Sequence, residues 1–178
     1  PFVIINGANV SNLRSDIAVI ESEVSNVLDY GGVLVYDEID GVSGTSYPTG
    51  TRYQPVNNPA DLKTLQDNLD ITDILLRSDM NCVTGVTFTN TLFQSNTAVP
   101  FVYFAGEANG FDGCMFYRVR LSGDVHSQIV AQDCAVYDIC NVQGILDNCH
   151  FMSRICIHPN GGLNTSHCVS GIPGNESP

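Results

Sequence analysis

The chain has 178 residues, enough for one large domain or two small ones that bury a core of their own. Seven lysines and arginines stand against nineteen aspartates and glutamates, so the formal net charge is −12 at pH 7. This acidic balance argues against binding to nucleic acid or to an anionic membrane surface, because a polyanion would meet too few cations.

No apolar run approaches the roughly 18 residues that a membrane-spanning helix needs, so we expect no membrane insertion. The N-terminus lacks the basic start of a signal peptide. Because the sequence opens on Pro1 instead of Met, we expect a chain that is processed, trimmed or taken from partway into a longer protein.

Residues 1–30 are expected to form an apolar lead and a helix. The helix carries apolar residues at spacings of 3, 4, 3, 4 and 3, the a/d pattern of a coiled coil. These seam residues are Val10, Leu13, Ile17, Ile20, Val24 and Val27. β-Branched side chains at both a and d favour more than two strands, so the pattern predicts a homotrimer. The alternative is a single amphipathic helix packed on a globular body.

Residues 31–79 are expected to hold a strand, a long loop, a short helix and a strand that leads into the first coil. The loop 37–58 is rich in Gly, Ser, Thr and Pro but too apolar for a free linker, so we expect it to pack on a surface. Asn58 suits a helix N-cap with Pro59 in the first turn. The helix would cover the open end of a solenoid with Leu62, Leu65 and Leu69.

Residues 80–178 carry a recurring pattern in which a cysteine follows a small or polar residue. The cysteines concerned are Cys82, Cys114, Cys134, Cys149 and Cys168. From Cys114 onward their spacings are 20, 15 and 19 residues, in the range of β-solenoid coils. Segments 87–89 and 101–104 could supply the strands of two coils in the longer gap before Cys114.

The fold expected from these parts is mainly β: a right-handed parallel β-helix with an N-terminal coiled-coil helix and a short capping helix. Each coil would bury its inward side chains against the same positions of its neighbours. An antiparallel β-sandwich with turns at similar spacing is the alternative.

The seven cysteines are interpreted as reduced core residues, because they are odd in number and follow the repeat. A disulfide or a zinc site are the alternatives. The possible zinc ligands are Cys134, Cys140, Cys149, Cys156, His167 and Cys168. No C-x₂-C pair occurs among them, so no metal and no other cofactor is predicted.

Three motifs follow the heptad helix. Residues 32–37 read Gly-Val-Leu-Val-Tyr-Asp, residues 44–51 read Gly-Thr-Ser-Tyr-Pro-Thr-Gly-Thr, and residues 55–58 read Pro-Val-Asn-Asn before a helix and a solenoid. In this order of parts the chain resembles structural appendage proteins of tailed bacteriophages, the tail fibres and tailspikes, over about residues 10–170.

The resemblance implies a homotrimeric virion component with a coiled-coil neck and a β-helical shaft. Its expected partners are other tail or baseplate proteins and a host-surface glycan or protein receptor. The resemblance supplies no catalytic residue, so a non-catalytic role is favoured.

The alternative function is a β-helical polysaccharide-degrading enzyme, a glycoside hydrolase or lyase. Hydrolysis needs two carboxylates, one of them an acid with a raised pKa. Aspartates recur near the expected coil corners at Asp112, Asp124, Asp133, Asp138 and Asp147, and Asp133 with Asp147 is a conceivable pair on adjacent coils. Aspartate is also a common turn residue, which we favour as the explanation.

Four residues are predicted to contact a receptor. Tyr47 and Tyr53 lie in the long loop, and tyrosine suits half-exposed contacts. Arg118 and Arg120 would share one face of a strand by its period of two, where they could bind an acidic sugar or flank a subunit contact.

Overall fold

The computed structural model describes residues 15–17, 30–82, 85–96, 99–105, 110–125, 127–153, 155–157 and 162–170. Of the predicted coiled-coil seam, Val10, Leu13, Ile20, Val24 and Val27 lie outside these residues. Ile17 belongs to a described helical turn, and its side chain is 46% exposed. The trimeric seam therefore stays a prediction.

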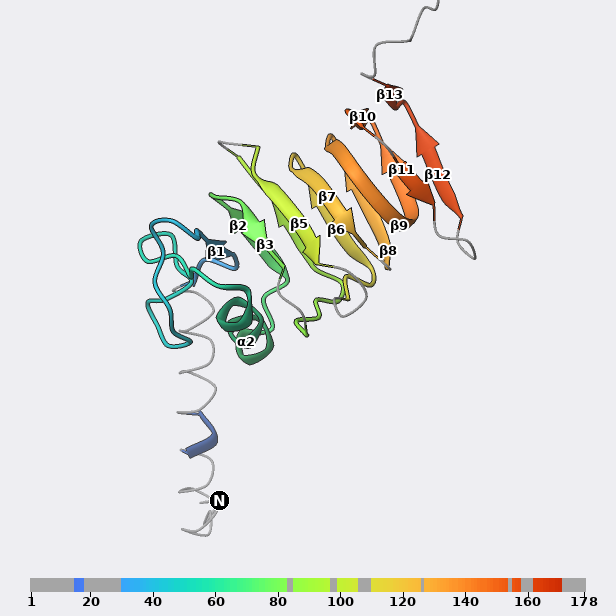
Figure 1. Cartoon of the computed structure of the whole chain (residues 1–178). Helices are drawn as coiled ribbons and strands as arrows, with labels where there is room; N and C mark the ends of the chain where they lie inside the picture. Colours follow the sequence, from blue (N-terminus) through green and yellow to red (C-terminus); the bar gives the residue numbers. More distant parts are fainter. Residues whose placement is uncertain are drawn as a thin grey trace, which may run out of the picture.

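The body is a parallel β-solenoid, as predicted, in which two sheets share the same coils (Figure 1). Sheet 1 contains β1 (Leu34–Tyr36), β2 (Asp73–Leu76), β4 (Leu92–Gln94), β6 (Cys114–Tyr117), β8 (Gln128–Gln132), the second half of β9 (Ala135–Asp147), and β12 (Leu163–Ser166). Sheet 2 contains β3 (Met80–Asn81), β5 (Phe101–Ala105), β7 (Arg120–Asp124), the first half of β9, β10 (His150–Phe151) and β13 (Val169–Ser170). β11 (Ile155–Ile157) pairs with the middle of β9.

The strand register gives the lengths of the coils. On sheet 1, Phe93 pairs with Phe116, Phe116 with Ala131, and Ala131 with Leu146, which are steps of 23, 15 and 15 residues. Each of these side chains points inward and is buried, so each covers its equivalent on the next coil. The rings of Phe93 and Phe116 stack with centroids 5.2 Å apart and only 9° between their planes.

The cysteines form a shorter column than the sequence predicts. The thiols of Cys134, Cys149 and Cys168 contact the carbonyl oxygens of three consecutive register partners, Phe116, Ala131 and Leu146, at 3.3–3.5 Å. Cys114 instead begins β6 on sheet 1, and Cys82 follows β3 on sheet 2. The predicted step of 20 residues from Cys114 to Cys134 is therefore wrong, because it joins two different positions of the coil.

The corner that leads from sheet 1 to sheet 2 rests on one left-handed residue per coil. Arg118, Asp133, Asn148 and His167 have φ angles between 50° and 56°. Each directly precedes the buried or half-buried residue that starts the turn into sheet 2: Val119, Cys134, Cys149 and Cys168. A single left-handed residue reverses the chain sharply, and Asn and Asp tolerate that conformation best.

The first coil is covered by the helix α2 (Pro59–Leu69) and the long loop, both at the β1 end of the solenoid (Figure 1). The Asn58 side chain accepts a hydrogen bond from the Asp61 amide at 2.8 Å and so caps the helix. Leu62 and Leu65 are buried, and Leu69 is partly buried against the core. The predicted capping helix and its three apolar residues are confirmed.

Gly144 lies in β9 directly beside its register partner Ile129 on β8. Its φ is +118°, and a Cβ there would lie 1.9 Å from the carbonyl oxygen of Ile129. Gly162 occupies open space, with no atom within 4 Å of an added Cβ. The two glycines therefore form a matched pair for testing the coil register.

We predict that Gly144→Ala destabilises the protein by about 2 kcal/mol or more, because the coil must move away from Ile129 or keep a strained backbone. Gly162→Ala should change the unfolding free energy by less than about 0.5 kcal/mol. Chemical denaturation of both variants measures the difference. Equal stability of the two would show that the register of β8 and β9 is wrong.

Candidate binding surfaces

The long loop packs on the first coil, as the sequence predicts. The Val35 amide donates to the Gly50 carbonyl at 2.8 Å, and the Asp37 amide donates to the Val56 carbonyl at 2.9 Å. Val56 is fully buried. The loop therefore occupies the free edge of β1 and is held there by backbone hydrogen bonds.

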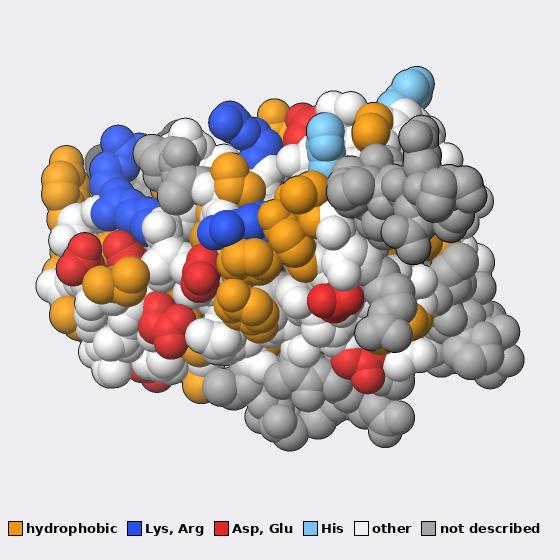
Figure 2. Space-filling view, turned by 45° about the horizontal axis from the view of Figure 1, so that its top comes forward, with side chains coloured by type: hydrophobic (Ala, Val, Ile, Leu, Met, Phe, Trp, Pro, Cys, Tyr) orange, Lys and Arg blue, Asp and Glu red, His pale blue; other side chains and the backbone are white. Residues whose placement is uncertain are grey.

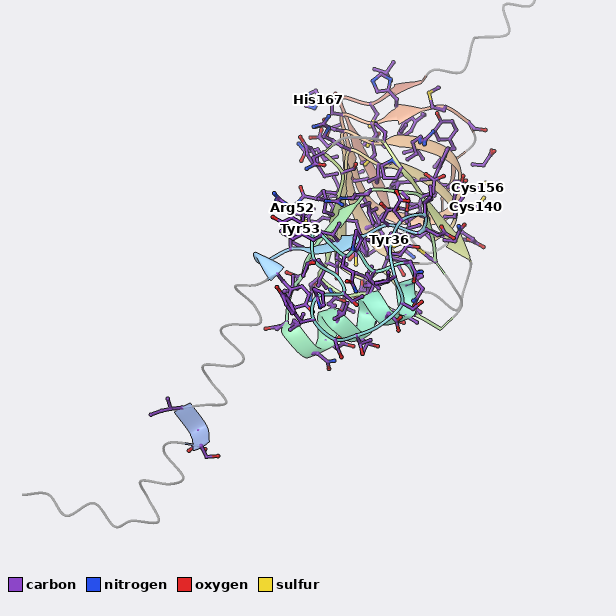
Figure 3. All side chains as sticks on the ribbon, turned by 90° about the vertical axis from the view of Figure 1, so that its left-hand side faces the viewer. Tyr36, Arg52, Tyr53, Cys140, Cys156 and His167 are labelled. Carbon is purple, nitrogen blue, oxygen red and sulfur yellow. The ribbon has the colours of Figure 1, made fainter. Side chains whose placement is uncertain are left out.

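Between this loop and the outer face of sheet 1 lies a hollow of about 380 Å³, which we call the loop groove. Its floor contains Val35 and Leu75, which are register partners on β1 and β2. The loop contributes Arg52 and Tyr53 to its wall, and both are labelled in Figure 3, Arg52 directly above Tyr53. Its remaining lining residues are Tyr30, Gly31, Val33, Thr51, Gln94 and Asn96.

The two tyrosines predicted as site residues lie in different places. Tyr53 is 95% exposed at the loop groove. Tyr47 is 55% exposed and meets the edge of the Tyr30 ring, with centroids 5.8 Å apart. It lines a second hollow together with Leu65 and other residues of α2. Both predicted tyrosines therefore lie at the surface, but they line two different hollows.

Arg120 lies on the outer face of sheet 2 and packs on an aromatic cluster. Its guanidinium carbon is 3.9 Å from the centre of the Phe101 ring, and its Nη2 is 3.8 Å from Asp79 Oδ1. The Phe101 ring also contacts Tyr103 at 5.0 Å and Tyr137 at 5.2 Å between centroids. We call Phe101, Tyr103 and Tyr137 the aromatic shelf. In Figure 2, hydrophobic side chains surround a basic one near the middle of the face, with acidic side chains beside them.

Next to the aromatic shelf is a strongly acidic hollow of about 460 Å³. It shares Tyr103 and Asp79 with the surroundings of the shelf. Its other lining residues are Asp37, Glu38, Ile39, Asp40, Arg77, Ser78 and Asn81. This charge would repel an anionic ligand and leaves the hollow suited to a neutral or cationic one.

Arg118 does not share a strand face with Arg120, which corrects the prediction. It is an exposed corner residue with a left-handed backbone, and β7 begins two residues later at Arg120. A period of two applies only inside a strand, and the corner between the arginines turns their side chains apart. Arg118 lines a shallow hollow with Asp133, His150 and three other residues.

Five aspartates of the coils accept hydrogen bonds from one coil to the next, and four of them are among the five candidates named from the sequence. In each case the carboxylate accepts from an uncharged side chain of the following coil, at 2.5–2.7 Å. The pairs are Asp73 with Gln94, Asp124 with Asn141, Asp133 with Asn148, Asp138 with Ser153, and Asp147 with Ser166. Hydrogen bonds to an ionised acceptor are stronger than neutral ones, so these contacts help to hold the coils together.

Asp133 and Asp147, the conceivable catalytic pair, also accept hydrogen bonds from the next coil. Asp133 accepts from Asn148, and Asp147 accepts from Ser166 and lies 3.1 Å from His167 Nδ1. The hydrogen bonds from Ser166 and His167 lower the pKa of Asp147. A lowered pKa keeps this carboxylate ionised at neutral pH, whereas a general acid needs the opposite shift.

The possible zinc ligands are spread over the solenoid. Cys134 and Cys149 belong to the buried column, whereas Cys140 and Cys156 lie on the side opposite His167 (Figure 3). In the described part of the chain, no three His, Cys, Asp or Glu side chains converge as metal ligands. The seven cysteines are free thiols.

No protein-family model, curated protein or solved structure matches this chain. Within the described residues, no helix is long and apolar enough to cross a membrane.

Sequence reasoning missed Arg52, Leu75, Gln94 and Asn96 as groove residues. A signal for Arg52 was present, because it stands beside Tyr53 and is one of only seven basic residues in the chain. The other three come from later coils. They reach the groove only through the register that aligns Val35 with Leu75 and Leu75 with Gln94.

We predict that Arg118→Asn stabilises the protein by up to about 1 kcal/mol, because asparagine adopts the left-handed corner at lower cost. Arg118→Val should destabilise it by about 1 kcal/mol or more, since a β-branched side chain fits that conformation worst. Denaturation midpoints of the two variants provide the comparison. Equal midpoints would contradict the corner geometry.

A second prediction concerns the thiols. Cys82, Cys114, Cys134 and Cys149 are buried, and desolvation by burial raises the pKa of Cys114 to about 11. The hydrogen bond with Cys134 lowers the pKa of Cys149, so slow labelling of that thiol depends on its burial alone. These four should react with a thiol reagent at pH 8 at least tenfold more slowly than the half-buried Cys140, Cys156 and Cys168. All seven should react at one common fast rate in denaturant. Fast native labelling of the buried four would overturn the core assignment.

Proposed function

We propose that this chain is a non-catalytic structural component of a virion appendage, of the tail fibre or tailspike type, that works as a homotrimer and contributes to host attachment. The capped end and the β-solenoid follow the residues predicted to form the neck, which is the order of parts that the resemblance implies. The proposed partners are other tail or baseplate proteins and a host-surface glycan or protein receptor.

The observation that carries this proposal is an apolar column on the outer face of sheet 1. Leu92, Met115, Val130 and Ile145 are register partners on four successive strands. Met115 is 47% exposed and Ile145 is 45% exposed, while the other two are partly buried. A continuous apolar column on an outward face is typical of a protein contact.

We assign this column to the contact with other copies of the chain. A trimeric neck would place three solenoids side by side, where each could bury such a column. Four of the five candidate aspartates, Asp124, Asp133, Asp138 and Asp147, already accept hydrogen bonds from the next coil. No contact in the described residues favours the polysaccharide-degrading alternative.

The neck is tested by Ile17→Asp. The wild-type chain should have a mass near three times 19.2 kDa by light scattering, and the variant should fall towards one, because each seam layer would bury a carboxylate. Ser15→Asp places the same charge off the seam and should leave the mass unchanged. A wild-type monomer, or an Ile17→Asp trimer, would sink the trimer proposal.

The solenoid contact is tested by Met115→Glu. It should weaken trimer association at least tenfold, as measured by mass against protein concentration, because a charge would enter an apolar contact. Gln132→Glu adds a charge to an exposed polar position of the same sheet and should change association less than threefold. Identical behaviour of both variants would place the subunit contact elsewhere.

A further inference from the structure

We propose that the loop groove binds an acidic saccharide unit, a hexuronic acid or a sugar of similar chemistry, with its carboxylate on Arg52 and its ring on Tyr53. This inference rests on the proposed attachment function and names the ligand class and the site. The residues of this site are not Arg118 and Arg120, the pair that the sequence predicts to bind an acidic sugar, because a corner separates those two arginines.

The charge of the groove is the first argument. Its lining contains Arg52 and no carboxylate, in a chain where acids outnumber basic residues by nineteen to seven. The acidic hollow on sheet 2 has the opposite character, with four carboxylates around Arg77. Within the described part of the chain, the Arg52 guanidinium makes no ion pair. It is therefore available for a two-pronged contact with a ligand carboxylate.

The shape and chemistry of the groove fit one sugar ring or two. Its volume of about 380 Å³ lies within the roughly 300–1,000 Å³ of small-molecule sites. The Tyr53 ring is 95% exposed and offers a flat face for stacking, while Val35 and Leu75 give an apolar floor. Asn96 places an amide at the groove for sugar hydroxyl groups, whereas the Gln94 amide already donates to Asp73 at 2.7 Å.

The two wall residues are held in place by a compact turn. The Gly50 amide donates to the Gln54 carbonyl at 2.8 Å, and the Thr51 amide donates to the Pro48 carbonyl at 3.1 Å. The Gln54 amide donates to Thr51 Oγ1 at 3.3 Å. Because residues 50–54 are tied together in this way, little backbone order has to be gained when a ligand binds.

The test is a calorimetric titration of the full chain with tri-galacturonic acid and with neutral galactotriose. Wild type should bind the acidic trisaccharide at least tenfold more tightly. Arg52→Gln should remove this preference, and Tyr53→Ala should weaken binding of both sugars at least fivefold. Arg77→Gln, in the acidic hollow, is the matched control and should leave both affinities unchanged.

Both groove residues are exposed, so their variants should keep the wild-type melting temperature and mass. The inference is overturned if wild type binds neither sugar, binds both equally, or keeps its preference in Arg52→Gln. It is also overturned if Arg52→Gln dissociates the trimer, because Arg52 would then serve a subunit contact. The proposed function is judged separately, by the mass of the wild-type chain and of Ile17→Asp.

Discussion

The structure depends on one constraint: each coil can bury its inward side chains only against the same positions of the coils beside it. Phe93, Phe116, Ala131 and Leu146 satisfy this constraint along sheet 1. The first coil has no such neighbour on its open side. The helix α2 and the loop 37–58 take that role, with Leu62, Leu65 and Val56 buried where a further coil would lie. The cap therefore does for the first coil what a neighbouring coil does within the shaft: it covers the inward apolar side chains.

Polar side chains are also paired between adjacent coils, and this pairing determines which of them remain open to a ligand. The coil aspartates accept hydrogen bonds from uncharged donors on the next coil, so an acidic chain stacks without placing carboxylate on carboxylate in these pairs. Arg120 is likewise engaged, on Phe101 and beside Asp79. Among the described residues, the apolar column of sheet 1, the aromatic shelf and the loop groove with Arg52 face outward.

Local signals predicted the most from sequence. The helix Pro59–Leu69 could be predicted because its N-cap and its apolar spacing lie within a dozen residues. The solenoid could be predicted from the recurring cysteines. Which cysteines stack in one column could not, because the coils differ in length from 15 to 23 residues and a constant spacing therefore does not identify equivalent positions. The prediction that Arg118 shares a strand face with Arg120 was wrong, because a left-handed corner at Arg118 interrupts the period of two. The groove could not be predicted, since Arg52 and Gln94 meet only through the register of three strands.

The strand register that joins β1 to β2 and β2 to β4 makes cap and coils one unit. Native-state hydrogen exchange tests it most directly. We predict that the amides of Val35, Asp37 and Val56, which bond between β1 and the loop, exchange as slowly as those of β4, β6 and β8 in the shaft. Fast exchange at these three amides, with protection confined to the shaft, would show an unattached loop on an open-ended solenoid and would contradict the account.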